Sequence, residues 1–282
     1  MPFDLHTHSH VSDGTEPPAA VVRAAASAGL TGLALTDHDS TAGWKEAHEQ
    51  ALSSGISFIP GMEVSCFSET GISVHLLSYL HDPHAPGLYG EIERSRQSRL
   101  SRAQRMVERL AGDYPITWEM VLEHSSPNAT IGRPHIADAL VTAGVVDDRS
   151  AAFSSILTPR SPYYVGHYAP DPVEAVRLVI EAGGVPVFAH PMASVRGRVV
   201  GVDLFREMID AGLAGVEADH RDHSEEDRRT LWDLAREHGL FVTGSSDYHG
   251  AGKPNRLGEY TTPDAVVAQI EERATGSAVI RP

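Results

Sequence analysis

The sequence predicts an α/β fold, a barrel of repeated β/α units that carries a helical insertion. Two observations indicate this fold. Short apolar runs alternate with helix-like segments, as they do in parallel β/α units. In addition, the phrases SAGLTGLALTDHD, EAGGVPVFAHP, DAGLAGVEADH and EHGLFVTGSSDYH share one plan: a helix end, a glycine, an apolar strand and then polar residues. Because barrel strands end at one mouth, these polar endings predict where the functional site lies.

The predicted strands follow the apolar runs in order along the chain. The runs after the N-terminal strand lie at residues 33–36, 56–59, 74–77, 185–189, 215–218 and 241–243. The first unit reads as strand, loop and helix, and its Ala-rich helix is expected to end at Ala28, because Gly29 suits the residue after a helix. Each unit therefore has an identifiable strand and an identifiable break.

Residues 84–170 depart from this plan. A long, arginine-rich helical stretch covers 88–110, two further helical stretches follow at 116–124 and 134–143, and no apolar run of comparable strength interrupts them. Pro159, Pro162, Pro170 and Pro172 mark the return to the barrel pattern. We therefore expect residues 1–83 and 171–282 to form the barrel, and residues 84–170 to form a helical insertion over its mouth.

Composition limits the possible partners. The 282 residues include 23 Lys and Arg against 38 Asp and Glu, a net charge of -15, which argues against a broad basic surface for long duplex nucleic acid. The single cysteine, Cys66, excludes an internal disulfide. No signal-like N-terminus and no apolar run of about 18 residues is present, so we expect a cytoplasmic protein without a membrane partner.

Nine potential metal ligands fall at or near the predicted strand ends. They are His6, His8, Asp13, His38, Glu63, His75, His190, Asp247 and His249. Imidazole and carboxylate ligands together suit zinc, iron or manganese. Nine ligands exceed the need of one ion, so we expect two or three divalent cations, with Glu63 and Asp247 as the bridging carboxylates. The alternative, in which these histidines are ordinary core or loop residues, does not explain their shared position.

The motifs DLHTHSHVSDGT, ALTDHDS, GMEVS, AHP and SSDYH resemble the successive motifs of the PHP (polymerase and histidinol phosphatase) superfamily. The resemblance implies a distorted seven-stranded β/α barrel with a two- or three-metal phosphoesterase site. It also implies how the ligands are shared: His6, His8, Glu63 and Asp247 for a first metal, Glu63, His75 and His190 for a second, and Asp13, His38 and His249 for a third. Some relatives have histidine in place of Asp13.

The stretch GRPHIADALV at 132–141 resembles a subgroup of nucleoside 3′,5′-bisphosphate phosphatases, close to the 5′-to-3′ exonuclease RNase AM. The predicted function is therefore hydrolysis of the 3′-phosphate of a nucleoside 3′,5′-bisphosphate, leaving a nucleoside 5′-monophosphate. Three alternatives remain: a 5′-to-3′ exonuclease on short RNA, a histidinol-phosphate phosphatase, and a nucleotide-binding module with structural metals.

Hydrolysis at such a centre needs a hydroxide activated between two cations, and Glu63, His190 and Asp247 are the predicted catalytic residues around it. Two sets of residues outside the nine are predicted to contact substrate. Arg133 and His135 are candidates for a second, non-reacting phosphate. The remaining candidates are Arg99 and Arg102, which share a helix face with Arg105, and His223; for all of these a solvated position is the alternative. Asp37 and Asp39 flank His38 and are expected to orient ligands or cap a helix.

Overall fold

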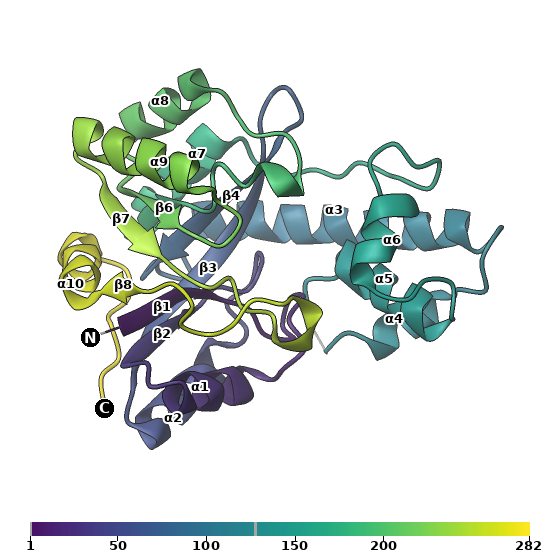
Figure 1. Ribbon diagram of the computed structural model, residues 1–282, viewed down its shortest axis with the longest axis horizontal. Helices are drawn as coiled ribbons and strands as arrows, with labels where there is room; N and C mark the ends of the chain where they lie inside the picture. The colour runs from purple at the N-terminus through teal and green to yellow at the C-terminus, as the bar shows by residue number, and fades with distance from the viewer. Residues whose placement is uncertain (1, 127–128) are drawn as a thin grey trace.

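The computed structural model describes residues 2–126 and 129–282. Its strands form one sheet in the order β7-β6-β5-β4-β3-β2-β1-β8. They are β1 (Pro2–Thr7), β2 (Gly32–Leu35), β3 (Ser57–Phe67), β4 (Ser73–Tyr79), β5 (Val185–Phe188), β6 (Gly215–Asp219), β7 (Phe241–Gly244) and the two-residue β8 (Thr262–Pro263). The short β8 pairs with β1 and contacts β7, so the sheet is nearly closed (Figure 1). The predicted distorted β/α barrel is confirmed.

The direction of β4 differs from the prediction of parallel units. It runs antiparallel to both β3 and β5. The backbone turns back at once after β3, where Ser68 N–H donates to the Ile72 carbonyl (2.9 Å), and a connection this short leaves no room for the helix of a parallel crossover. As a result the start of β4, and not its end, lies at the mouth of the barrel, and His75 pairs with Ser65 of β3 there.

Helices cover the outside of the sheet (Figure 1). They are α1 (Pro18–Ser27), α2 (Trp44–Ser54), α7 (Pro172–Glu181), α8 (Val202–Asp210), α9 (Glu225–His238) and α10 (Asp264–Arg273). Their apolar faces pack on the strands, so α1 and α2 bury Val21, Val22 and Ala47 against Leu33 and Phe58. The short strands thus hold the polar residues that follow them in fixed positions at the mouth.

Four further helices lie between β4 and α7: α3 (Pro86–Leu110), α4 (Trp118–Glu123), α5 (Arg133–Thr142) and α6 (Arg149–Ser155). Together they bury their own apolar cluster, which runs from Ala103 to Val165. The first turns of α3 instead pack Leu88 and Ile92 into the barrel cluster. Figure 1 shows α3 extending from the barrel to α4, α5 and α6. The predicted division at residues 84 and 170 stays a prediction, because α3 belongs to both cores.

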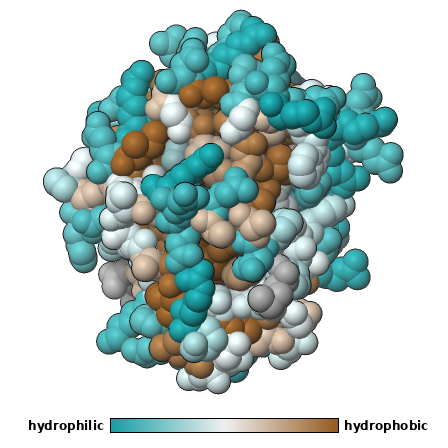
Figure 2. All heavy atoms as spheres, turned by 90° about the vertical axis from the view of Figure 1, so that its left-hand side faces the viewer, coloured by the Kyte–Doolittle hydropathy of each residue, from teal (hydrophilic) through white to brown (hydrophobic). Residues whose placement is uncertain are grey.

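The face that carries α10 and the chain ends has a hollow of about 470 Å³ between α9, β7 and α10. Trp232, Leu240, Phe241 and Val266 are among its lining residues. Figure 2 shows apolar side chains gathered in patches on this face. None of the predicted site residues lines the hollow. Within the described part of the chain, no helix is both long and apolar enough to cross a membrane.

Candidate metal centre

The end of β1 brings two imidazoles into one cluster. His6 lies in β1 and His8 directly after it, and their Nε2 atoms are 3.0 Å apart. Both side chains are fully buried. Residues two apart on a strand point to the same face, so this closeness follows from the strand geometry that the His-x-His spacing predicted. Two buried imidazole nitrogens facing each other form the start of a ligand set.

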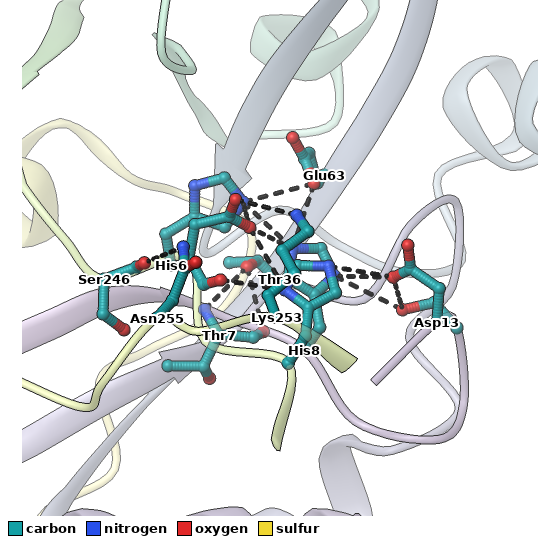
Figure 3. Close-up of polar contacts among 12 residues, drawn as sticks. His6, Thr7, His8, Asp13, Thr36, Glu63, Ser246, Lys253 and Asn255 are labelled. Carbon is teal, nitrogen blue, oxygen red and sulfur yellow. Dashed lines mark hydrogen bonds and ion pairs between the residues drawn. The ribbon is translucent and has the colours of Figure 1, made fainter. Parts of the chain in front are cut away.

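Glu63 connects the imidazoles of the cluster, and Figure 3 shows dashed lines running from its carboxylate to neighbouring side chains. It lies inside β3, which continues past the predicted end of that strand. Its two carboxylate oxygens reach nitrogens of five imidazoles: His6 (3.2 Å), His8 (3.1 Å) and His38 (3.2 Å) through Oε2, and His75 (2.7 Å) and His190 (3.1 Å) through Oε1. A carboxylate shared in this way has the geometry of a bridging ligand between cations.

Asp247 reaches the same cluster from the loop after β7. Its Oδ1 lies 3.5 Å from His6 Nε2 and 3.3 Å from His8 Nε2. The backbone at Asp247 has φ +53°, and His190 has φ +30°, both in the left-handed region that non-glycine residues rarely adopt. Such strain is retained where the surroundings fix it, and it gathers at functional sites.

Asp13 forms the far side of the cluster with His249 and His38. Asp13 Oδ1 is 3.1 Å from His249 Nε2, and Asp13 Oδ2 is 3.8 Å from His38 Nε2. The ring of His249 stacks on that of His8, with centroids 4.1 Å apart. The Asp13 side therefore adjoins the Glu63 side, as Figure 3 shows for Asp13, His8 and Glu63.

All nine predicted ligands thus meet at one mouth. Potential ligand atoms lie within 4.8 Å of one another in four groups: His8, Asp13, His38 and His249; His6, Glu63 and His190; His6, His8 and Asp247; His38, Glu63 and His75. Three buried nitrogens in these groups could bind cations, because they have no hydrogen-bond partner: His38 Nδ1, His75 Nδ1 and His249 Nε2. Buried polar atoms without partners are rare, and imidazole with carboxylate is a donor set that suits divalent transition metals.

Sequence reasoning missed Glu217, which holds two of these ligands from behind. This residue of β6 is fully buried; its Oε1 lies 3.1 Å from His6 Nδ1, and its Oε2 accepts the His190 backbone N–H at 2.8 Å. Such a partner fixes which ring nitrogen faces a metal. The available signal was one acid inside the apolar run GVEAD.

Asp37, predicted to orient ligands, accepts Ser12 Oγ–H (2.7 Å), and Ser12 Oγ is 3.3 Å from His8 Nδ1.

The loop that carries Asp247 and His249 is fastened to β1. Asp4 accepts the Ser246 N–H (3.0 Å) and the Gly258 N–H (2.9 Å), and Asn255 donates to the Ser246 carbonyl (2.7 Å; Figure 3). These contacts explain how the loop tolerates the strained backbone at Asp247.

Two cations outside the predicted set contact Asp247. Arg196 Nη2 and Lys253 Nζ lie 2.6 Å and 3.0 Å from Asp247 Oδ2. Both are partly exposed, with side chains 28% and 32% accessible, whereas Asp247 is 1% accessible. Arg196 also pairs with Asp222 at 2.6 Å. The protein therefore places positive charge at the solvent side of the cluster, next to its carboxylate ligand.

The electrostatics of the cluster keep its carboxylates ionised. Burial alone would raise the pKa of Asp247, but Lys253, Arg196 and His249 hold it well below its usual range. Burial likewise works against ionised Glu63, and the surrounding imidazoles lower its pKa well below the usual range. Burial lowers the pKa of His190 to about 3, with Arg196 adding to the shift. Burial would lower the pKa values of His6 and His8, but Glu63 and Asp247 raise them, that of His8 to about 9, so a cation bound here would replace protons on these two imidazoles.

A second group of charges lies beside this cluster. Arg99 Nε is 3.0 Å from Asp39 Oδ2, and its guanidinium also donates to Ser65 Oγ. Asp39 follows His38, and Ser65 pairs with His75, so Arg99 lies next to the Glu63 side of the metal centre. Asp39, expected to orient a ligand or cap a helix, accepts the Ser65 N–H (2.8 Å) as well.

Arg99, Arg102 and Arg133 lie close together, and we call them the arginine cluster. Burial, Arg133 and Arg99 lower the pKa of Arg102 to about 9. Burial and the three guanidiniums lower the pKa of His167 to about 2, and both of its ring nitrogens are buried without a partner. The solvated alternative is therefore wrong for Arg99 and Arg102, whereas Arg105 is exposed. A helix of 3.6 residues per turn explains this drift away from the shared face.

Two predicted substrate residues, His135 and His223, are buried and point away from the arginine cluster. His135 is 2% exposed and accepts the Gly132 N–H at Nδ1 (3.1 Å). Residues two apart on a helix point to different sides, so the side chains of Arg133 and His135 diverge. His223 is 4% exposed; its Nδ1 lies 2.8 Å from the Ala218 carbonyl oxygen and its Nε2 accepts the Met192 N–H (3.2 Å). The solvated alternative is therefore wrong for His223.

Comparison with known proteins agrees with this geometry. The PHP domain family matches residues 4–117. A 3′,5′-nucleoside bisphosphate phosphatase of Chromobacterium violaceum is 34% identical over 99% of this chain and 98% of the relative. The 5′-3′ exoribonuclease Rnm of Salmonella typhimurium is 30% identical over 88% of this chain and 85% of the relative.

A solved structure from Bifidobacterium adolescentis, described as a metal-dependent phosphoesterase, has 42% identity and a TM-score of 0.94 over 98% of both chains. The structure of an amidohydrolase from Chromobacterium violaceum, with bound sulfate and no metal, has 32% identity and a TM-score of 0.88, covering 100% of this chain and 98% of that one. Sequence, fold and ligand cluster lead to the same conclusion: the chain belongs to the PHP family and is a metal-dependent phosphoesterase, a hydrolase of phosphoric esters.

Proposed function

We propose that the chain removes the 3′-phosphate from nucleoside 3′,5′-bisphosphates and leaves nucleoside 5′-monophosphates. The observation that carries this proposal is the arginine cluster beside the metal centre. A monoester needs one phosphate site, whereas a bisphosphate needs a second anion site at a fixed distance from the reacting one. The relative named as a 3′,5′-nucleoside bisphosphate phosphatase supports the same substrate class.

Two or three divalent cations, of manganese, iron or zinc, would be held by the nine ligands. The proposed sets are those that the resemblance implies: His6, His8, Glu63 and Asp247; Glu63, His75 and His190; Asp13, His38 and His249. The groups of neighbouring ligand atoms divide the same residues differently, with His190 beside His6 and Glu63, and His75 beside His38 and Glu63. When bound, such cations lower the pKa of coordinated water and neutralise charge on a phosphoryl group. Glu63, His190 and Asp247 would carry the catalytic part of this centre. They belong to two ligand groups that share His6: His6, Glu63 and His190 form one, and His6, His8 and Asp247 form the other.

Arg196 and Lys253 would add to this charge neutralisation. Both contact Asp247 Oδ2, and both remain partly open to solvent at the mouth. A phosphoryl group entering there would meet two side-chain cations as well as the metal centre. We propose that they stabilise negative charge that develops on the transferred phosphoryl group and the leaving oxygen.

The arginine cluster would hold the phosphate that does not react. Arg133 is the first residue of α5. A Cβ added at the preceding Gly132 would lie 3.7 Å from Arg99 Nη1, so the start of α5 faces Arg99. The described contacts of the cluster include one carboxylate, Asp39 on Arg99. His167, whose buried ring nitrogens have no partner, can donate to an anion there. Guanidinium groups bind phosphate oxygens in bidentate fashion, which suits this role.

A second candidate function is stepwise cleavage of short RNA from its 5′ end. Relatives named as 5′-3′ exoribonucleases, 29–30% identical over 88% of this chain, favour it. The phosphate bound by the arginine cluster would then belong to the RNA chain. A relative named as a phosphoribosyl 1,2-cyclic phosphate 1,2-diphosphodiesterase, 34% identical over 88% of this chain, makes a cyclic diester a further substrate to test. Two alternatives are disfavoured. Histidinol phosphate has one phosphate and would leave the arginine cluster unused. A nucleotide-binding module would not need the enzyme family's full ligand set.

One preparation with added Mn²⁺ separates these substrates. We would compare kcat/KM for adenosine 3′,5′-bisphosphate, adenosine 3′-monophosphate, a short 5′-phosphorylated RNA, a ribose 1,2-cyclic phosphate and histidinol phosphate. The proposal predicts the highest value for the bisphosphate, with adenosine 5′-monophosphate and inorganic phosphate as products. A higher value for the RNA or for the cyclic diester would contradict it, as would equal values for the bisphosphate and the 3′-monophosphate.

A further inference from the structure

The helical insertion contacts the loop that carries Asp13. Three backbone carbonyls of this loop, those of His10, Val11 and Asp13, accept hydrogen bonds from the insertion. Ser126 Oγ–H donates to His10 O (2.8 Å), and Thr130 N–H donates to Val11 O (2.9 Å).

Two more residues of the insertion, His135 and Arg149, lie beside the loop. Burial lowers the pKa of His135, the nearby Asp13 carboxylate and Ser12 backbone oppose that shift, and its Nδ1 accepts the Gly132 N–H. Arg149 Nη1 donates to Asp13 O at 3.0 Å. His135, for which the sequence suggested a phosphate contact, is therefore engaged with the loop of a proposed metal ligand.

Arg149 is itself held rigidly. Its Nε and Nη2 donate to the two carboxylate oxygens of Asp138, each at 2.6 Å. A bidentate pair fixes the plane of a guanidinium, which leaves its remaining Nη1 directed at Asp13 O. Gly252, in the loop after His249, approaches the same guanidinium, since a Cβ added there would lie 2.3 Å from Arg149 Nη1. Arg149 thus lies between the two loops that carry Asp13 and His249.

Asp13 is one of the proposed ligands that need such support. His6, Glu63 and His75 lie within strands of the sheet, whereas Asp13 lies in the loop between β1 and α1. A ligand on a loop holds its geometry only if surrounding contacts fix the backbone. For the Asp13 loop, contacts of this kind come from α5, α6 and the residues before α5, all of which lie outside the sheet.

We propose that Ser126 and residues 130–149 form a clamp for the third metal position, with Arg149 and His135 as positioning residues that keep the Asp13 carboxylate directed at His38 and His249. Retention of a cation among His8, Asp13, His38 and His249 depends on the Asp138–Arg149–Asp13 contact. The proposal rests on the metal centre described above. It assigns the insertion a role in metal retention, separate from substrate binding by the arginine cluster.

The test is a count of bound Mn²⁺ for the full chain, by equilibrium dialysis with elemental analysis, without substrate. The wild type should bind three ions per chain. In Arg149→Gln the dissociation constant of one ion should rise ~10- to 100-fold, as for other residues that orient ligands, and the other two should bind as before. Arg149→Lys should recover part of the loss, because an ammonium keeps one donor for Asp13 O. Arg160→Gln, on an exposed residue of the same insertion, is the matched control and should bind like the wild type.

Asp138→Asn tests the same contact from its other end and should weaken the same ion if Arg149→Gln fails to fold. Unchanged binding of all ions in both variants overturns the clamp, as does an equal loss at every site or a wild type that never binds a third ion. No substrate enters this measurement. A chain active on bisphosphates with two ions would overturn the clamp alone, and a chain inactive on them could still bind metal as described.

Discussion

The metal centre and the arginine cluster adjoin each other but carry opposite imbalances of charge. In the metal centre, three carboxylates and six imidazoles converge, and buried nitrogens such as His249 Nε2 make no hydrogen bond. In the arginine cluster, burial and the neighbouring guanidiniums lower the pKa of Arg102 to about 9 and the pKa of His167 to about 2. The metal centre would bind cations, and the arginine cluster would bind an anion. A metal-bound substrate with two phosphates would supply both.

The two regions also differ in how they are built. The ligands of the metal centre come mainly from strands and strand ends, and Glu217, Asp4 and Asp37 hold them from behind. The arginines come from helices α3 and α5, and apart from Asp39 and Ser65 on Arg99 their described contacts are backbone carbonyls and aromatic faces. Arg102 Nε donates to Val165 O (3.1 Å), and Arg133 Nη1 donates to Leu157 O (3.2 Å). The metal centre is thus fixed by the sheet, and the arginine cluster by helix packing.

The largest effect should follow from the loss of a proposed metal ligand, Asp247. Asp247→Asn removes the charge shared by His6 and His8 and should lower kcat about a thousandfold, since a metal centre supplies several kcal/mol of transition-state stabilisation. Steady-state rates with Mn²⁺ measure it. Asp210→Asn, on an exposed residue at the end of α8, is the control and should keep wild-type kcat. A kcat for Asp247→Asn near that of the wild type would separate Asp247 from the chemistry.

A smaller loss, of metal affinity, should follow from a change at Glu217, which contacts the proposed ligand His6. Glu217→Gln keeps the size of the side chain but removes the charge beside His6 Nδ1, so Mn²⁺ affinity should fall ~10- to 100-fold. Metal titration measures the affinity. The matched change Glu237→Gln, on an exposed part of α9, should leave it unaltered. Equal affinities in both variants would mean that the sheet positions His6 without Glu217.

The arginine cluster should affect substrate choice and not the chemical step. Arg133→Ala should raise KM for a nucleoside 3′,5′-bisphosphate ~10- to 100-fold, the value of a lost charged hydrogen bond, and should raise KM for a monophosphate far less. Steady-state kinetics on both substrates measure the difference. Arg105→Ala, on the exposed residue of α3, serves as the control. Equal changes for both substrates would remove Arg133 from the second phosphate site.

The smallest kinetic effect is expected at His223, because both of its ring nitrogens bind backbone groups. His223→Gln should reduce the free energy of unfolding by about 1–3 kcal/mol and leave KM unchanged. Denaturant unfolding and steady-state kinetics together check this. A rise in KM comparable with that of Arg133→Ala would instead make His223 a substrate contact.

The convergence of the nine candidate ligands could be predicted from the sequence, because strand ends in a β/α barrel meet at one mouth whatever their distance along the chain. Their role as metal ligands stays a prediction. The sequence did not predict the direction of β4, since the alternation of apolar and polar residues is the same for parallel and antiparallel strands. Glu217 was missed because one acid in an apolar run looks like an ordinary strand residue until its partner His6 is known.

Residues of the insertion were harder to predict, because helix packing decides which side faces the site. Arg133 and His135 are neighbours in one motif, yet the helix turns them to different sides, one to the arginine cluster and the other to the Asp13 loop. The role of Arg149 depends on a contact with Asp13 across 136 residues, which no local pattern contains.

The most direct test of the account is anomalous scattering from crystals grown with Mn²⁺ and soaked with a nucleoside 3′,5′-bisphosphate. The account predicts manganese peaks on both sides of the Glu63 carboxylate, with one phosphate at the peaks and the other at Arg99, Arg102 and Arg133. Manganese bound away from Glu63, or a nucleotide whose second phosphate lies away from the arginine cluster, would contradict it.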